Sequence, residues 1–477
     1  MIDRGEILAV ASDLSLAPDV VEKDYVLGWL LAGIRASEAL AHSWVFKGGT
    51  CLKKCYFETY RFSEDLDFTV TDETQLDAEY LTRTFGDVAT WVYDQSGIEI
   101  PGGELRFDVY RNHRDRLSCE GRVYYRGPLR RAGNLSRIKL DLTVDEVLVL
   151  PPVERLVVHP YTDCPVDGII ARCYAYEEIF GEKVRALAER TRPRDLYDVI
   201  NLFRSVEFRP MAAAVLEVLQ KKCAFKGIPV PTFATIATGS AELTADWSAM
   251  LGHQLPTLPP FASFWDELPE FFAWLEARAE RRLAKAERVP SEEELFRPAV
   301  GALRREGIAG SSFLETIRFA AANRLCVDLT YQNKVRRIEP YSFRRTLAGE
   351  IILRSVRRED GEARTYRFDR IQGAKATDES FTPRYEIEIS PAGFGPIPPT
   401  RRTALPSSAR KVASPRLSSP PRGRRLKSST GPRYIYQCSY CQKKFSHRKS
   451  DGRLHAHKTP QGYPCPGRSG FFVTTKF

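Results

Sequence analysis

The fold of this chain is predicted from Arg61-Phe62-Ser63-Glu64-Asp65-Leu66-Asp67-Phe68-Thr69-Val70, a stretch in which apolar and polar residues alternate. Alternation with period two is typical of a strand with one buried face, so Phe62, Leu66, Phe68 and Val70 share one face and Ser63, Asp65 and Asp67 share the other. Upstream, Trp44-Val45-Phe46 predicts a short strand that runs into Gly48-Gly49-Thr50, and a helix is expected from Cys51 to about Phe57. The order is therefore strand, glycine turn, helix, strand.

Two carboxylates on one strand face repel each other unless a cation lies between them or the site is open to water. Mg²⁺, or Mn²⁺ in its place, suits Asp65 and Asp67 because it takes oxygen ligands from one or two carboxylates and completes its shell with phosphates and water. The segment Ile138-Lys139-Leu140-Asp141-Leu142-Thr143 repeats the alternation, so a neighbouring strand would bring Asp141 to the same site. Three carboxylates would hold two metal ions for phosphoryl or nucleotidyl transfer.

Other residues fit the same reaction, although each also has a plain structural interpretation. Gly48 and Gly49 would let the backbone approach a triphosphate, with the Thr50 hydroxyl binding its oxygens, or would form a simple tight turn. Lys183 falls within the apolar stripe of a helix predicted over 175 to 190, so it either extends to solvent or meets an anion. Asp195 lies at the start of a helix predicted over 194 to 205, where the helix dipole alone favours an acid.

Composition bounds the class of protein. The 477 residues predict two to four domains, and 43% hydrophobic with 28% charged residues is ordinary for a globular protein. There is no run of 18 apolar residues and no leader pattern, so a cytosolic protein is expected. Positions 396 to 477 carry 18 Lys plus Arg against one acid, a net +17, which leaves −7 of the total +10 for the first 395 residues. Such a basic arm either meets nucleic acid or is a solvated linker.

Four motifs resemble those of the AbiEii/AbiGii-type toxin nucleotidyltransferases. They are Phe46-Lys47-Gly48-Gly49-Thr50, the segment from Arg61 to Asp67, Glu178-Ile179-Phe180-Gly181-Glu182-Lys183 and Pro193-Arg194-Asp195-Leu196-Tyr197-Asp198. The upstream segment from Val21 to Leu27 is similar to that family's N-terminal helix. The motifs stand in the family's order, and the resemblance covers roughly residues 15 to 205.

This resemblance implies a DNA polymerase β-like nucleotidyltransferase fold. It implies a toxin of abortive phage defence that is paired with a separately encoded antitoxin and transfers nucleotides from a nucleoside triphosphate to an RNA acceptor, with tRNA as the expected substrate. Carried onto this chain, Ser63, Asp65, Asp67, Asp141 and Asp195 form the catalytic set, and Gly48, Gly49, Thr50 and Lys183 bind the nucleotide. The rival hypothesis is a nucleic-acid-binding regulator or sensor whose transferase fold is inactive.

The region from about 325 to 385 predicts a small all-β module of short strands. It is similar to the WYL domain, an SH3-like or Sm-like barrel, although Ile351-Ile352-Leu353 replaces the tripeptide that names that family. In related modules basic residues line a groove for nucleic acid or a nucleotide-like ligand. The corresponding candidates are Arg336, Arg367 and Arg370, and solvated surface arginines are the alternative.

The C-terminal tail has the spacing of a zinc site. Cys438-x2-Cys441 is followed by His455-x-His457 and Cys465, which predicts a Zn²⁺ ion held by Cys438, Cys441, His457 and Cys465. His457 is preferred because Phe445 and Leu454-x2-His457 are similar to the core and ligand helix of two-cysteine, two-histidine zinc fingers, while His455 and His447 remain alternatives. The other seven cysteines are interpreted as buried or idle thiols.

The sequence thus predicts an α+β protein of four parts. Residues 1 to 290 form the nucleotidyltransferase domain, with a catalytic strand region at 44 to 145 and a helical part at 175 to 290. Residues 291 to 395 form a helical lead-in and the WYL-like barrel, 396 to 433 a basic disordered linker, and 434 to 477 the zinc-binding module. Further strands are expected at 104 to 110, 119 to 126 and 136 to 143, and further helices at 211 to 222, 261 to 286 and 291 to 306.

Overall fold

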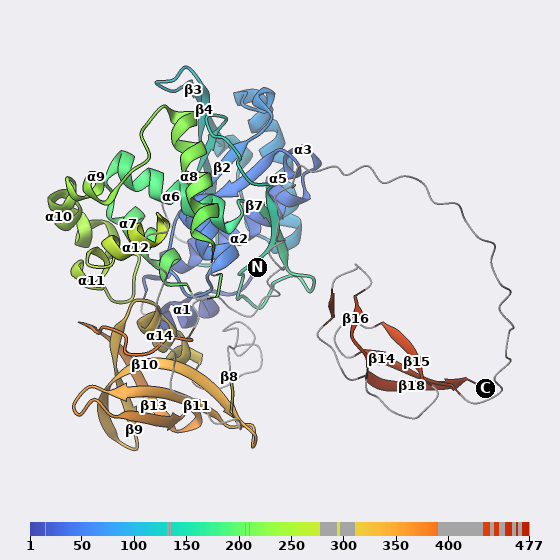
Figure 1. The fold of residues 1–477 in the computed structure, drawn as a ribbon. Coiled ribbons are helices and arrows are strands. Elements are labelled where there is room, and N and C mark those ends of the chain that lie inside the picture. Colours follow the sequence, from blue (N-terminus) through green and yellow to red (C-terminus); the bar gives the residue numbers. More distant parts are fainter. Residues whose placement is uncertain are drawn as a thin grey trace, which may run out of the picture. The chain divides into compact units, whose positions relative to one another are not determined.

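The computed structural model describes residues 1–276 apart from 15, 131, 132, 134, 206 and 209, then 293–295 and 311–389, and in the tail 433–438, 443–447, 454–459, 464–465 and 470–476. The chain divides into two compact units, Met1–Pro398 and Pro399–Phe477 (Figure 1). The predicted linker 396–433 lies outside the described residues except for its last position. None of the described helices is long and apolar enough to cross a membrane.

A seven-stranded mixed sheet forms the centre of the predicted transferase domain (Figure 1). Its strands run in the order β3-β4-β5-β2-β1-β7-β6, where β2 pairs in parallel with β5 and antiparallel with β1. The three strands predicted downstream of the glycine turn are confirmed, but the strand expected from Phe62 begins only at Asp65. The bounds are β1 Trp44–Lys47, β2 Asp65–Val70, β3 Arg106–Arg111, β4 Leu117–Tyr125, β5 Ser136–Thr143, β6 Val153–Val157 and β7 Ile169–Cys173.

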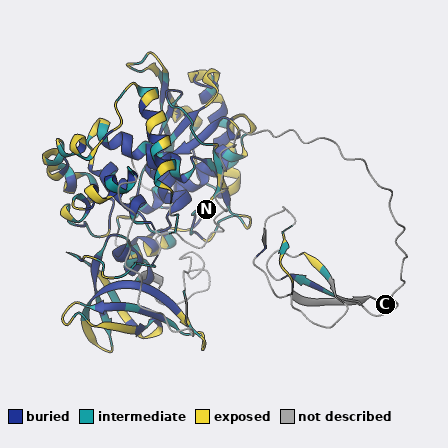
Figure 2. Ribbon diagram, in the orientation of Figure 1, coloured by how far each residue is buried: buried dark blue, intermediate teal, exposed yellow. Residues whose placement is uncertain are grey.

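Apolar packing holds this sheet in the middle of the domain. Figure 2 shows the central strands mostly in the colour of buried residues, and the rings of Trp44, Phe46 and Phe68 pack on one another along β1 and β2. Helix α2, Pro18–Ala36, packs against β7 and against α5, Ala78–Ser96. The segment from Val21 to Leu27, which is similar to an N-terminal helix of the resembled family, lies within α2, and this helix is buried on most of its surface.

Helices follow the sheet, as predicted. The expected helices at 175 to 190, 194 to 205 and 211 to 222 are α6, Tyr176–Arg190, α7, Pro193–Arg204, and α8, Ala212–Lys226. The helix expected over 261 to 286 is broken, as far as residue 276, into α11, Ala262–Trp265, and α12, Leu268–Leu275, because Pro269 is tolerated only in a first helical turn. Positions 277 to 286 lie outside the described residues. Two helices that were not predicted from the sequence precede α11: α9, Phe233–Ala237, and α10, Ser240–Leu251. α1, Arg4–Leu14, packs on α2.

The predicted all-β module is a six-stranded sheet that follows α14, Ser311–Ala322. Its main path is β12-β11-β10-β9-β13, and β8 pairs with β10. The helix expected over 291 to 306 is wrong at Glu293–Leu295, which forms β8: its backbone pairs with Arg344 to Thr346, and that ladder outweighs the helical preference of an acidic segment. The bounds are β9 Leu325–Tyr331, β10 Lys334–Thr346, β11 Ile351–Arg357, β12 Ala363–Arg367 and β13 Ile371–Ser380.

The described part of the tail is made of strands. β14 pairs with β15 and β18, and β16 pairs separately with β17. The expected ligand helix is wrong, because His457 begins strand β16 and pairs with Cys465. The bounds are β14 Arg433–Cys438, β15 Lys444–His447, β16 His457–Lys458, β17 Pro464–Cys465 and β18 Gly470–Lys476.

Candidate active site

Three predicted carboxylates meet at the edge of one cavity. The parallel pairing of β2 with β5 sets Asp67 opposite Asp141 and Asp65 opposite Lys139. All three carboxylates line a cavity of about 300 Å³, together with Ser63, which precedes β2. The predicted convergence therefore occurs, and the register of two neighbouring strands is its cause.

Electrostatics at these carboxylates favour a bound cation. Burial, followed by repulsion from Asp141, raises the pKa of Asp67 to about 6, and the same two causes raise the pKa of Asp65. Lys139 Nζ lies 3.1 Å from Asp141 Oδ1 and 3.2 Å from Glu120 Oε2, so one lysine offsets only part of the negative charge. A set of convergent carboxylate oxygens suits a hard divalent ion.

The glycine turn approaches Asp67 closely. Gly48 has a φ of +79°, and a Cβ built on it would lie 2.1 Å from Asp67 Oδ2, while a Cβ on Gly49 would lie 2.5 Å from Arg61 Nη2. Both glycines line the cavity. Thr50 does not: it is fully buried, and its hydroxyl donates a hydrogen bond to the Asp65 carbonyl. Thr50 therefore orients the carboxylate strand instead of facing the cavity.

Lys183 meets anions rather than extending to solvent. The side chain is buried, and its Nζ lies 2.8 Å from Asp198 Oδ2 and 3.4 Å from Asp195 Oδ1. Asp195 also accepts two hydrogen bonds from Arg190, at 2.8 and 2.9 Å. Lys183, Asp195 and Arg190 all line the cavity. The position of Lys183 within the apolar stripe of its predicted helix is the feature of the sequence that indicated a buried charge here.

A buried pair behind the glycine turn had no role assigned from the sequence. Arg61 donates to both oxygens of Asp198, Nε to Oδ1 at 2.8 Å and Nη2 to Oδ2 at 2.7 Å. Burial by itself would raise the pKa of Asp198, but the charges and hydrogen bonds of Arg61 and Lys183 together hold it well below its usual range. Asp198 thereby connects the segment before β2 with the lysine on α6. In the sequence, Arg61 and Asp198 stand out only as members of the motifs that resemble the toxin nucleotidyltransferases.

Arginines gather where α6 passes into α7. Arg190, Arg192 and Arg194 all line the cavity. Within the described part of the chain, Arg192 and Arg194 have no ion-pair partner, and burial together with the charge of Arg61 lowers the pKa of Arg194. The cavity is thus acidic on its β2 and β5 side and basic on its α6 and α7 side.

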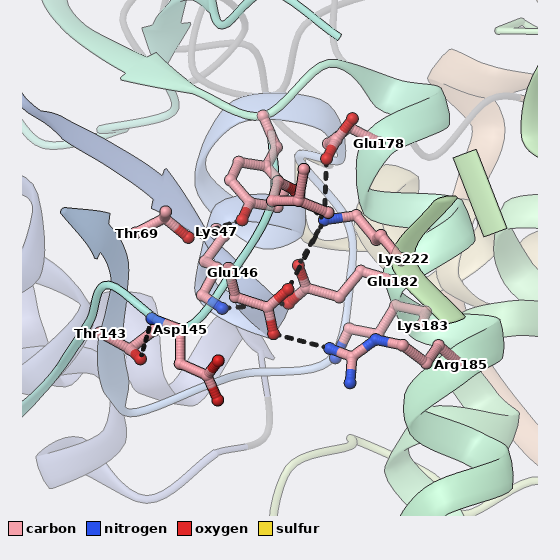
Figure 3. Close-up of polar contacts among 12 residues, drawn as sticks. Lys47, Thr69, Thr143, Asp145, Glu146, Glu178, Glu182, Lys183, Arg185 and Lys222 are labelled. Carbon is pink, nitrogen blue, oxygen red and sulfur yellow. Dashed lines mark hydrogen bonds and ion pairs between the residues drawn. The ribbon is translucent and has the colours of Figure 1, made fainter. Parts of the chain in front are cut away.

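A network of buried charges supports the α6 side of the cavity (Figure 3). The fully buried Lys222 of α8 lies 2.7 Å from Glu178 Oε1 and 3.5 Å from Glu182 Oε2. Lys47 Nζ is 3.4 Å from Glu182 Oε1, and Arg185 is 2.7 Å from Glu146. Figure 3 shows these side chains pointing toward one another from β1, α6, α8 and the segment after β5. This network was not predicted from the sequence, because most of its members are far apart along the chain.

The arginines predicted on the β module do not line the cavity. Arg336 donates to the Tyr331 carbonyl at 2.6 Å, and Arg367 pairs with Glu350 at 2.5 Å and with Asp369 at 2.8 Å. Arg370 is exposed. All three lie on the module's surface.

The tail brings three of its four predicted ligands together. The ligand atoms of Cys438, His457 and Cys465 lie within 4.8 Å of one another, and the two sulfurs are 3.7 Å apart. Tetrahedral Zn–S bonds of about 2.3 Å place two sulfurs about 3.8 Å apart. His457 Nδ1 donates to the His455 carbonyl at 2.8 Å, which keeps the lone pair on Nε2, the common arrangement of a metal-binding histidine. Cys441 and the His447 side chain lie outside the described residues, and His455 is exposed.

Comparisons with known proteins found similar solved structures and one family model. Among solved structures, the chain is similar to MenT4, a nucleotidyltransferase toxin of Mycobacterium tuberculosis, at 19% identity and a TM-score of 0.39, over 58% of this chain and 90% of that one. It is also similar to JHP933 of Helicobacter pylori, at 18% identity and a TM-score of 0.35, over 55% and 94% of the two chains. No curated protein matches.

One family model covers more than half of the chain. The model of the nucleotidyl transferase AbiEii toxin, of type IV toxin–antitoxin systems, matches residues 29–277. Its match contains the glycine turn, the three carboxylates and Lys183. The chain therefore belongs to the AbiEii family of toxin nucleotidyltransferases and is a nucleotidyl-transferring enzyme.

Proposed function

We propose that this enzyme is a Mg²⁺-dependent toxin that transfers nucleotides from a nucleoside triphosphate to an RNA acceptor, with tRNA as the substrate class, and that a separately encoded antitoxin restrains it. The observation that carries this proposal is the cavity itself: Asp65, Asp67 and Asp141 line it from the sheet, and Lys183 lines it from α6. An acidic wall for metal and a basic wall for phosphate are what nucleotidyl transfer requires.

Asp65, Asp67 and Asp141 would hold the metal. Mg²⁺, or Mn²⁺, when bound there would activate the acceptor hydroxyl and neutralise the leaving pyrophosphate. The raised pKa of Asp67 supports this role, because burial and repulsion from Asp141 leave that carboxylate in need of a positive partner. Ser63 lines the cavity next to these groups and would orient one of the oxygens bound there.

The basic side of the cavity would bind the triphosphate. Lys183, Arg192 and Arg194 offer positive charge, and the backbone of Gly48 and Gly49 lines the same cavity. Asp195 acts as a positioning residue, since it holds Lys183 at 3.4 Å and accepts two bonds from Arg190.

Charge supports RNA as the acceptor. The +17 of residues 396 to 477 stands against −7 for the rest of the chain, so affinity for a polyanion would come from the tail. We also propose that the tail holds one Zn²⁺ ion through Cys438, Cys441, His457 and Cys465. Arg336, Arg367 and Arg370 of the β module would add phosphate contacts from its surface. The rival function, a regulator with an inactive fold, gives no reason for the intact carboxylate set.

Asp65→Asn tests the enzymatic proposal. The purified full chain is incubated with each labelled nucleoside triphosphate, Mg²⁺ and tRNA or total RNA. The wild type should label one RNA class, and Asp65→Asn should lower the rate by about 100-fold or more, because it keeps the shape but removes a charge that the metal needs.

Asp94→Asn is the matched control, since Asp94 is exposed on α5 and lies outside the cavity. It should transfer at the wild-type rate. Transfer at full rate by a folded Asp65→Asn protein would refute the proposed role of the carboxylates. Labelling of DNA or protein instead of RNA would refute the proposed acceptor.

A further inference from the structure

A second cluster of metal-binding side chains lies within the transferase, apart from the catalytic carboxylates. The sulfur atoms of Cys51, Cys55 and Cys173 all lie within 4.8 Å of one another. The three residues are 0%, 4% and 0% exposed, and none of them lines the catalytic cavity. The sequence predicts buried or idle thiols at these positions, because the cysteines are scattered along the chain without a pairing rhythm.

The fold brings the three thiols together directly behind the glycine turn. Cys51 ends α4, Gly48–Cys51, the short helix that begins with both turn glycines, and Cys55 follows in the π-helical segment Leu52–Tyr56. Cys173 is the last residue of β7 and pairs in parallel with Phe46 of β1. An ion bound to all three sulfurs would therefore tie the helix after the glycine turn to the sheet.

The donor set selects the kind of metal. In the described part of the chain, no other Cys, His, Asp or Glu joins this group, so the site offers three sulfur ligands. Zn²⁺ in a structural site takes four protein ligands, and this group offers three. Soft thiolate ligands select monovalent copper, which is stable with two or three sulfur ligands. We propose that Cys51, Cys55 and Cys173 form a three-coordinate site for a soft monovalent cation, Cu⁺.

The surroundings can accept the charge of such a site. Each sulfur that binds Cu⁺ releases its proton, so the bound cluster is anionic. Arg155 lies beside it: its Nε donates to the Cys55 carbonyl at 2.6 Å, and its guanidinium carbon is 4.3 Å from the centre of the Tyr56 ring. This cation, held against the residue that follows Cys55, offsets part of the thiolate charge.

The other buried thiols of the domain provide an internal contrast. Cys119 of β4 and Cys223 of α8 are each 1% exposed, yet neither belongs to a group of three metal-binding side chains among the described residues. They are expected to act as small apolar core residues, as buried cysteines commonly do. Cys119 therefore makes a matched control for a substitution at the cluster.

Copper binding by the full chain tests the proposal. A parent variant carrying Cys438→Ala, Cys441→Ala and Cys465→Ala removes the thiols of the tail. It is titrated without oxygen with Cu⁺ in competition with a chromophoric Cu⁺ chelator. The parent should bind one Cu⁺ per chain with three sulfur neighbours in X-ray absorption, and its thermal midpoint should rise by several degrees. Adding Cys173→Ala should abolish this binding, and adding Cys119→Ala should not.

Several outcomes would overturn the site. They are no Cu⁺ bound by the parent, unchanged binding after Cys173→Ala, and nitrogen or oxygen neighbours around the bound ion. Zn²⁺ that displaces Cu⁺ from the parent would overturn the choice of metal. Should Cys173→Ala fail to fold, Cys55→Ala replaces it, and the sulfur count of the parent decides the question without either variant.

Discussion

Gly48 is the residue at which the backbone and the carboxylate site meet most closely. Gly48→Ala should lower the free energy of unfolding by about 1 to 3 kcal/mol, because a side chain at φ +79° is strained and its Cβ would lie 2.1 Å from Asp67 Oδ2. The collision also moves Asp67, so nucleotidyl transfer should fall more steeply than stability. Urea denaturation and the initial rate of RNA labelling measure the two effects.

Gly86→Ala is the control for this substitution. Gly86 lies inside α5, and a Cβ there would meet no heavy atom within 4 Å. Alanine in an open helical position is favoured, so this variant should gain up to about 1 kcal/mol and keep its activity. A Gly48→Ala protein as stable and active as Gly86→Ala would show that the close approach at Asp67 has no consequence.

His159 gives a prediction about pH. Its ring is fully buried against Tyr25, Trp29 and Tyr161, and burial lowers its pKa below the usual value. The unfolded chain therefore takes up a proton near pH 6.5 more readily than the folded one, so stability should fall as the pH drops from about 7 to 5. Chemical denaturation at each pH measures this loss of stability. His159→Gln should reduce the loss, whereas His42→Gln, at an exposed position, should leave it unchanged. Equal pH dependence in all three proteins would contradict the assignment.

At the scale of elements, Lys222 joins α8 to α6. Lys222→Met should cost about 3 to 5 kcal/mol, because the fully buried ammonium lies 2.7 Å from Glu178, and its loss leaves buried carboxylates without a partner. Adding Glu178→Gln should recover part of that loss. Lys221→Met is the control, since Lys221 is 56% exposed and pairs with Glu217 within α8. Equal destabilisation by both lysine variants in urea denaturation would contradict the buried network.

The sequence predicted elements well where one periodic pattern sufficed. The alternation over Asp65 to Val70 and over Ile138 to Thr143 yielded β2, β5 and the convergence of three carboxylates. The bidentate pair of Arg61 and Asp198, like the cluster of three thiols, depends on distant segments that only the folded sheet brings together. The missed strand β8 depends on pairing with β10 in the same way. The helix or strand preference of a short segment carries no information about contacts between segments far apart along the chain.

At the scale of the whole molecule, the catalytic cavity and the excess of positive charge belong to different units. Unit Met1–Pro398 contains the catalytic cavity, whereas unit Pro399–Phe477 carries a net charge of +17 and the Cys438, His457 and Cys465 cluster. Variants of the tail are therefore expected to change how tightly RNA binds, seen in its KM and salt dependence, more than the rate constant of transfer. Variants of the cavity should lower the rate constant of transfer more than they change the KM for RNA.

The metal content of the full chain tests the proposed zinc site of the tail. One Zn²⁺ per chain is expected, because two sulfurs 3.7 Å apart and a histidine that donates through Nδ1 match tetrahedral ligation, and so small a module depends on metal for stability. Cys465→Ser should abolish zinc binding, whereas Cys326→Ser, a buried thiol of the other unit, should retain it. His457→Gln should weaken binding by far more than His455→Gln, since His455 is exposed. A chain that binds no zinc, or that loses zinc equally with either histidine variant, would refute the ligand set.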